Sequence, residues 1–96
     1  MSWTMTKKPH SLGGIQKLYK FSNGLILSAI QTDFSYGNRK HMGEQGLWEI
    51  AVLTNKFGEW KTRDIFPDAD DDVIGWLTDD DLTNCLDAVD KASILI

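Results

Sequence analysis

The sequence is poor in cysteine and has no long apolar run. Cys85 is the one cysteine among 96 residues, so an internal disulfide is excluded and a reducing compartment is expected. The longest apolar stretch, 25–30, is interrupted by Ser28 and is far too short to cross a bilayer. Residues 1–8 lack the apolar segment of a secretory signal. These absences predict a cytoplasmic protein with no membrane partner.

Motifs for catalysis and for cofactor binding are also missing. The glycines have neither the spacing nor the strand-to-helix context of a P-loop or a dinucleotide fingerprint. His10 and His41 have no cysteine or carboxylate at ligand spacing, which argues against zinc. Cys85 lies on the apolar face of a predicted helix with no base placed near it, as expected of a structural thiol. We therefore expect a non-enzymatic protein without a cofactor or a metal.

The charges are divided unevenly along the chain. Net charge is −4, but residues 1–63 carry nine Lys and Arg against four Asp and Glu, whereas residues 64–96 carry one Lys against ten Asp. The two parts could attract each other within the fold, or lie on separate faces and meet separate partners. The sequence leaves both alternatives open.

Period-two alternation predicts a β-hairpin over 15–32. The segments "IQKLYKF" and "LILSAIQT" flank Asn23-Gly24, the pair preferred in a two-residue type I′ turn. Such a turn pairs Tyr19 with Ser28. The core face of the hairpin would then hold Leu18, Leu25, Leu27 and Ala29.

The remaining pattern predicts an α+β fold of one domain. Residues 47–54 are apolar on both faces, as in a central strand, and 59–65 form a short fourth strand. Thr78 and Asp81 resemble a capping box at the start of an amphipathic helix that reaches about Ala92. We expect a small antiparallel sheet of three to four strands with one C-terminal helix packed on it. Residues 1–14 are predicted to be a flexible arm or an added edge strand, 15–96 are the domain, and the apolar 94–96 should pack on it.

Residues 67–82, "PDADDDVIGWLTDDDL", contain seven aspartates. Three of them fall at the predicted helix start, where carboxylates complement the helix dipole. Asp68, Asp70 and Asp72 occupy positions 1, 3 and 5 of an EF-hand register, but Val73 stands where that loop requires glycine and Asp79 where it requires glutamate. Calcium is therefore disfavoured, which leaves a solvated loop or a negative patch that docks on a basic partner. Trp76, beside the acidic loop, is a candidate binding anchor.

A second candidate surface lies in the polar loop 33–46. Tyr36, Arg39, Lys40 and His41 combine stacking with positive charge, a mixture suited to phosphate contacts. Clusters of this size are more often simply solvated. A loop of fourteen residues nevertheless exceeds the usual hairpin connection, which is typical of functional or disordered segments.

Three phrases, "YKFSNGLILS", "GLWEIAVL" and "DDVIGWLTDDDL", are together similar to a loose group of short proteins of tailed bacteriophages. In that group an NG hairpin is followed by a G-L-aromatic-E-hydrophobic strand and a D-D-V-hydrophobic-G-aromatic-L-T segment that leads into a short acidic helix. The likeness covers roughly 17–90, and its motifs form the fold rather than a catalytic site. The resemblance implies a phage setting and, by analogy, a cytoplasmic protein of the host cell that blocks a host complex, as anti-CRISPR and other anti-defence proteins do.

The leading hypothesis is a non-enzymatic inhibitor that docks an acidic surface on a host protein or protein–nucleic-acid complex. The alternative is a small nucleic-acid-binding or regulatory module that uses the basic loop 36–41 and the strand lysines. A third hypothesis is an assembly accessory that forms homo-oligomers through an edge strand. The predicted partner-binding residues are Asp68, Asp70, Asp71, Asp72, Trp76, Asp79, Asp80, Asp81, Tyr36, Arg39 and Lys40.

Overall fold

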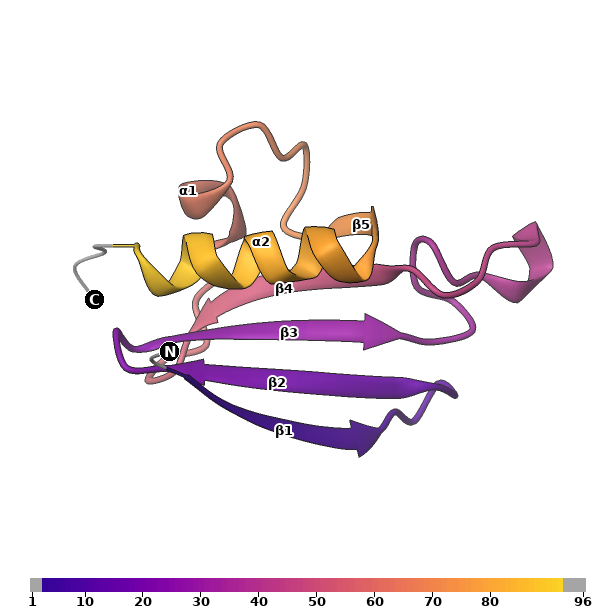
Figure 1. Ribbon diagram of the computed structural model, residues 1–96, viewed down its shortest axis with the longest axis horizontal. Helices are drawn as coiled ribbons and strands as arrows, with labels where there is room; N and C mark the ends of the chain where they lie inside the picture. Colours follow the sequence, from indigo (N-terminus) through magenta and orange to yellow (C-terminus); the bar gives the residue numbers. More distant parts are fainter. Residues whose placement is uncertain (1–2, 93–96) are drawn as a thin grey trace.

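The computed structural model describes residues 3–92, which form an antiparallel sheet and a long C-terminal helix (Figure 1). Each strand pairs with the next one in the sequence, so the sheet order is β1-β2-β3-β4-β5. The α+β class is confirmed, but the sheet has five strands where three to four were predicted. The elements are β1 (Trp3–Pro9), β2 (Ile15–Phe21), β3 (Leu25–Gln31), the 3-10 turn η1 (Lys40–Met42), β4 (Trp48–Thr54), α1 (Thr62–Ile65), β5 (Ile74–Leu77) and α2 (Asp79–Asp90).

Two strands differ from the prediction: β5 (Ile74–Leu77) was not predicted, and β1 was predicted only as an alternative to a flexible arm. β1 pairs with β2 along its whole length, from Trp3 opposite Phe21 to Pro9 opposite Ile15. Of the two alternatives for the N-terminal residues, the chain adopts the edge strand and not the flexible arm. The Trp3 ring lies 5.4 Å from the Phe21 ring and anchors the strand, while the six residues that follow Trp3 are exposed. Because so little of β1 is buried, its sequence shows no clear apolar alternation.

The turn between β2 and β3 is longer than the predicted one. The Gly24 N–H donates to the Phe21 carbonyl at 3.1 Å, so the loop contains residues 22–24. Gly24 has φ of 89°, whereas Asn23 keeps a negative φ. This is the geometry of a type I turn followed by a left-handed glycine, and not of a type I′ turn, which needs positive φ at both central residues.

The longer turn shifts the hairpin register by one residue. Tyr19 pairs with Leu27, where Ser28 was predicted. Because a one-residue shift turns every side chain of a strand to the other face, the predicted core face of β2 was wrong. Tyr19 and Phe21 are buried in the core, and Leu18 lies on the opposite face of the sheet.

β4 lies between β3 and β5, as its two apolar faces predicted. The predicted fourth strand over 59–65 was wrong in its extent, because only Trp60 bridges to Leu53 and α1 begins at Thr62. The fully buried Thr62 explains this change of course: its Oγ1 accepts the Val52 N–H at 2.9 Å, in place of a backbone carbonyl. The Thr62 side chain thus satisfies the β4 backbone N–H at the point where the neighbouring segment leaves the sheet.

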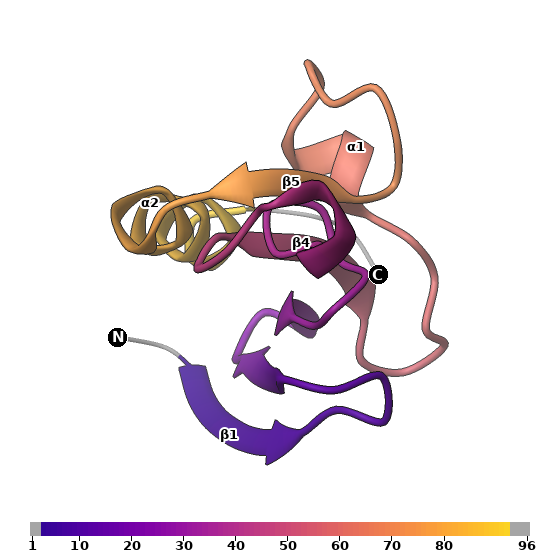
Figure 2. The same cartoon turned by 90° about the vertical axis from the view of Figure 1, so that its right-hand side faces the viewer.

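α2 begins where the sequence predicted. Thr78 Oγ1 accepts the Asp81 N–H at 3.1 Å, and Asp81 Oδ2 accepts the Thr78 N–H at 3.0 Å, which completes a capping box. Leu82, Leu86 and Val89 are buried. Figure 2, which looks along the strands, shows α2 against one side of the sheet.

The core lies between α2 and this side of the sheet. Each fully buried aliphatic side chain contributes roughly 1.5–3 kcal/mol of apolar transfer free energy to folding. Within residues 3–92, no helix has the length and apolar character needed to cross a membrane. The packing predicted for 94–96 falls outside the described residues. The core cluster consists of Tyr19, Phe21, Leu25, Leu27, Ala29, Trp48, Ile50, Val52, Leu82, Leu86 and Val89.

Candidate functional site

The acidic loop, residues 66–73, projects from the edge of the sheet. The outer edge of β4 first pairs with 59–61, where the Lys61 N–H donates to the Val52 carbonyl at 2.7 Å. It then pairs with β5, where Ile50 lies opposite Ile74. Between these two pairings the chain leaves the sheet, forms α1 and returns through 66–73 (Figure 1). The loop is therefore fixed at both ends by backbone hydrogen bonds to one strand.

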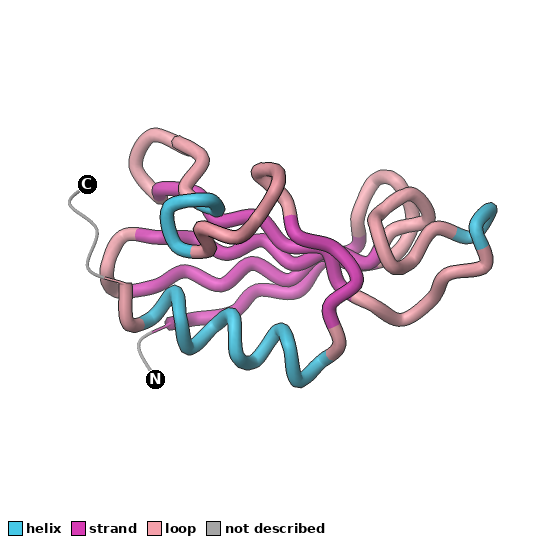
Figure 3. The backbone as a smooth tube through the Cα atoms, turned by 90° about the horizontal axis from the view of Figure 1, so that it is seen from above, coloured by secondary structure: helices cyan, strands magenta, loops and turns pink. Residues whose placement is uncertain are grey.

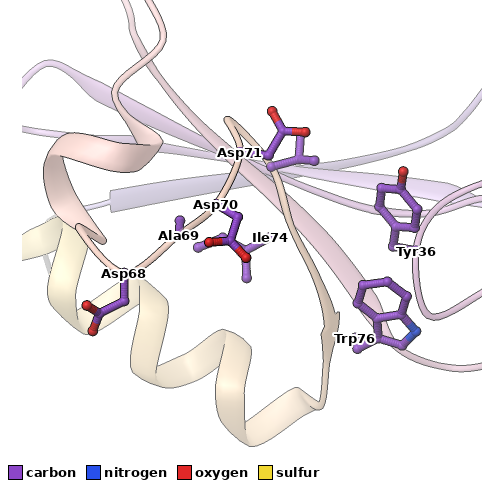
Figure 4. Close-up of a pocket in the computed structure, with 8 residues that line it drawn as sticks. Tyr36, Asp68, Ala69, Asp70, Asp71, Ile74 and Trp76 are labelled. Atoms are coloured by element: carbon purple, nitrogen blue, oxygen red, sulfur yellow. The ribbon is translucent and has the colours of Figure 1, made fainter.

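A pocket of about 320 Å³ lies between this loop and the polar loop 33–46. Three exposed carboxylates and three apolar side chains, all from 68–74, line one part of the pocket, and the aromatic rings of Tyr36 and Trp76 line the other (Figure 4). Two parts of the chain that were singled out separately in the sequence, 36–41 and 68–76, thus meet in one site. The lining residues are Tyr36, Asp68, Ala69, Asp70, Asp71, Val73, Ile74 and Trp76.

The aromatic wall is built by an unusual backbone. Tyr36 and Trp76 stack with ring centroids 5.1 Å apart and an interplanar angle of 27°. Trp76 has φ of 57°, a left-handed conformation that costs a side-chain-bearing residue of order 1–3 kcal/mol. The Trp76 N–H donates to the Tyr36 carbonyl at 3.3 Å, and any side chain at Gly75 would collide with Tyr36. The close approach of the two segments therefore depends on that glycine.

An ion pair within the polar loop, hydrogen-bonded to Trp76, holds this loop against β5. We call it the Arg39–Glu44 clasp. Arg39 Nε and Nη2 donate to the two Glu44 carboxylate oxygens, both at 2.7 Å, and the Trp76 Nε1–H donates to Glu44 Oε2 at 3.1 Å. The Arg39 guanidinium lies 5.0 Å from the Tyr36 ring and 5.5 Å from the Trp76 ring. The hydrogen bonds from Arg39 lower the pKa of the Glu44 carboxyl to about 2, so this group is ionised at neutral pH.

The basic residues predicted for partner binding are engaged within the loop. Arg39 belongs to the clasp, and Lys40 Nζ lies 3.3 Å from Asp33 Oδ1. The exposed ring of His41 lies 6.4 Å from the Phe34 ring. As Figures 1 and 3 both show, the loop extends beyond the end of the sheet. The cluster is therefore largely neutralised by the acidic residues of its own loop.

The four aspartates of the acidic loop separate into two groups. Asp72 accepts a hydrogen bond from Arg63 Nε at 3.2 Å and does not line the pocket. Within the described part of the chain, no basic side chain lies within ion-pairing distance of Asp68, Asp70 or Asp71. The pocket thus has three uncompensated carboxylates at its rim.

The aspartates of the helix start serve the fold. Asp79 Oδ1 accepts the Trp48 Nε1–H at 2.8 Å, and Asp81 completes the capping box with Thr78. Asp80 is exposed in the first turn of α2. None of the three lines the pocket. The predicted acidic surface therefore has two parts with different roles. Asp68, Asp70 and Asp71 line the pocket, and Asp79, Asp80 and Asp81 form the first turn of α2.

Sequence reasoning missed the residues that assemble the site. The sequence gives no signal for Glu44, because it does not show that Trp76 lies beside it. Gly75 carried a usable signal, since a glycine inside a strand often marks a close approach of another backbone. Nothing in the sequence marks Ala69, Val73 and Ile74 as pocket-lining residues, because they are apolar residues in an acidic context.

Across residues 3–92, no group of three or more His, Cys, Asp or Glu side chains is arranged to hold a metal ion. The three carboxylates at the pocket rim share it with aromatic and aliphatic side chains. This lining suits an organic cation better than a hard metal ion, which prefers six or more oxygen ligands or ordered water.

Comparison with known protein families, curated proteins and solved structures found no match to this chain.

Proposed function

We propose that this chain is a non-enzymatic binding protein that docks its acidic loop on a basic surface of a partner protein or protein–nucleic-acid complex. The observation that carries the proposal is the pocket, where Asp68, Asp70 and Asp71 stand beside an exposed aromatic pair. Uncompensated carboxylates steer a cationic partner toward the site, and exposed aromatics supply the apolar area that binding hot spots use. The site combines both.

The resemblance to phage proteins adds an expected consequence to this proposal. Docking would block a host complex, of the anti-CRISPR or other anti-defence kind, by steric and electrostatic occlusion in the host cytoplasm. The resemblance alone supports this part of the proposal.

The alternative nucleic-acid-binding function has less support. It needs free cations near Tyr36, but Arg39 and Lys40 are paired with carboxylates of their own loop. Tyr36 also lines the pocket that contains Asp68, Asp70 and Asp71, and these carboxylates would repel phosphate. The lysines of β1 and β2 are then the best candidates for contacts to nucleic acid. A gel-shift titration with single- and double-stranded DNA tests this alternative.

The docking proposal is tested by affinity capture from a bacterial lysate, followed by reconstitution with the purified partner. The bait proteins are the wild type and a pocket variant with Asp68→Asn, Asp70→Asn and Asp71→Asn. A control variant with Asp80→Asn, Asp87→Asn and Asp90→Asn loses the same net charge from α2.

We expect the wild type and the control to bind one purified protein with similar affinity, and the pocket variant to bind it at least about ten-fold more weakly at low salt. Binding should weaken as ionic strength rises. A partner that binds all three proteins equally, or whose binding is insensitive to salt, would contradict the proposal.

A further inference from the structure

The pocket has a lining that suits a cation with an apolar stem. Ala69, Val73 and Ile74 offer aliphatic contacts, while the carboxylates stand at the rim. In Figure 4 the Trp76 indole nitrogen points away from the acidic loop, so Trp76 presents ring carbon to the pocket. Among residues 3–92 no basic side chain lines the pocket, so an anionic ligand would find no counter-charge from them.

On the premise of the proposed docking function, we infer that the pocket receives an arginine side chain of the partner. The planar guanidinium would lie against the Tyr36 and Trp76 wall and donate to Asp70 and Asp71, while its methylene stem packs on Ile74. Guanidinium groups combine stacking on aromatic rings with forked donation to carboxylates, and an ammonium group does not.

The protein itself contains the same recognition chemistry next to this pocket. The Arg39 guanidinium approaches both aromatic rings and donates to both oxygens of one carboxylate, Glu44. The pocket again combines these two rings with carboxylates, here from the acidic loop. The Glu44 carboxylate is already paired with Arg39. Asp68, Asp70 and Asp71, by contrast, have no basic side chain within ion-pairing distance among residues 3–92.

The wall is also held in place before any ligand arrives. Glu44 fixes the Trp76 indole through its Nε1–H, and the Trp76 N–H is bonded to the Tyr36 carbonyl. A ligand therefore has little side-chain freedom to remove on binding, which lowers the entropic cost of association.

The inference is tested with three capped pentapeptides, Gly-Gly-X-Gly-Gly, in which X is arginine, lysine or citrulline. Citrulline keeps the planar head group of arginine and removes its charge. Binding is followed by two-dimensional ¹H–¹⁵N NMR, using the Trp76 indole N–H and the backbone amides of 68–76.

We expect the arginine peptide to shift these resonances in a saturable way. Its affinity should exceed that of the lysine peptide by several-fold and that of the citrulline peptide by about ten-fold. Asp70→Asn with Asp71→Asn, or Tyr36→Leu, should weaken binding, whereas Asp80→Asn with Asp87→Asn should leave it unchanged. The NMR fingerprint of the core amides shows whether each variant is folded.

Equal affinity for the lysine or the citrulline peptide would overturn the assignment to guanidinium. Shifts confined to 79–81, or no saturable shifts at all, would overturn the assignment to this pocket. Neither result removes the docking proposal, because a purified partner that distinguishes the pocket variant from the α2 control would still support it. Failure of the capture experiment would remove the docking proposal even if the arginine peptide binds.

Discussion

Asn23 in the β2–β3 turn donates its Nδ2–H to the Val89 carbonyl at 2.8 Å. The same amide group also lies 3.3 Å from the Ala92 carbonyl, and its Oδ1 accepts the Leu25 N–H at 3.1 Å. The Val89 carbonyl also accepts the Ala92 N–H at 3.2 Å, so Asn23 adds a side-chain donor at the end of α2, where carbonyls lack their usual helical partners. Asn23 thereby connects the hairpin to the C-terminal end of α2.

Asn23→Asp should destabilise the protein by about 1–3 kcal/mol. The substitution removes the donor and places a negative charge beside helix carbonyls, at the negative end of the helix dipole. Urea unfolding at pH 7 measures the effect. Asn55→Asp, in an exposed turn, is the control and should change the free energy of unfolding by less than about 0.5 kcal/mol. Equal urea midpoints for the two variants would show that the connection does not stabilise the fold.

The hairpin register predicts which side chains of β2 matter for stability. Phe21→Ala should lower the free energy of unfolding by about 3–5 kcal/mol, because Phe21 is buried in the core. Leu18→Ala should cost clearly less, because Leu18 lies half-buried on the opposite face. Urea unfolding of both variants decides the register. A larger loss for Leu18→Ala would favour the two-residue turn instead.

The Arg39–Glu44 clasp should give the polar loop a pH-dependent stability. The folded pKa of Glu44 is about 2, below its ordinary value of 4.5, because Arg39 donates two hydrogen bonds to it. A depressed carboxyl pKa stabilises the fold above the unfolded pKa, and that contribution is lost as the pH falls through the folded pKa. The stabilisation is therefore complete above about pH 5 and declines from there toward pH 2.

Glu44→Gln should lower the urea midpoint at pH 6, and its difference from the wild type should narrow by pH 3. Glu59→Gln is the matched control, since Glu59 is exposed and lies 3.8 Å from Lys61. It should show a smaller difference at pH 6. A Glu44→Gln difference that is constant between pH 6 and pH 3 would mean that ionisation of Glu44 does not stabilise the clasp.

Cys85 should react slowly with thiol reagents in the folded protein. Burial, together with the negative charge of Asp81, raises the pKa of the Cys85 thiol, and only the thiolate is nucleophilic. Labelling with a chromogenic disulfide at pH 7.5 should therefore be slower in buffer than in concentrated urea. Equal rates in the two solutions would show that the thiol is neither shielded nor perturbed.

Local chemistry made several elements predictable from the sequence. Thr78 and Asp81 form a capping box and are only three positions apart, so the start of α2 could be predicted without any tertiary contact. The apolar faces of β4 likewise identified a central strand. The hairpin was predictable as a hairpin, but its register was not, because Asn-Gly suits both a two-residue turn and the three-residue loop that the chain adopts.

Some members of the candidate site were predictable from the sequence, but its assembly was not. Tyr36, Trp76 and the aspartates of the acidic loop were singled out by residue type, since exposed aromatics and dense carboxylates stand out in any composition. Arg39 and Lys40 were predicted to bind a partner, because the sequence does not show that Glu44 and Asp33 approach them. The partners in these two ion pairs are five and seven positions apart in the sequence, so whether they meet depends on how the loop folds.

The sequence by itself determined the α+β class, the amphipathic C-terminal helix and the excess of negative charge after residue 63. Each of these depends on periodicity or composition within a short window. Only the tertiary structure decided that β1 joins the sheet, that Tyr19 and Phe21 face the core, and that Tyr36 meets Trp76 beside the acidic loop. Those outcomes depend on backbone pairing and close packing between segments far apart in the chain, and no short window of sequence contains both partners.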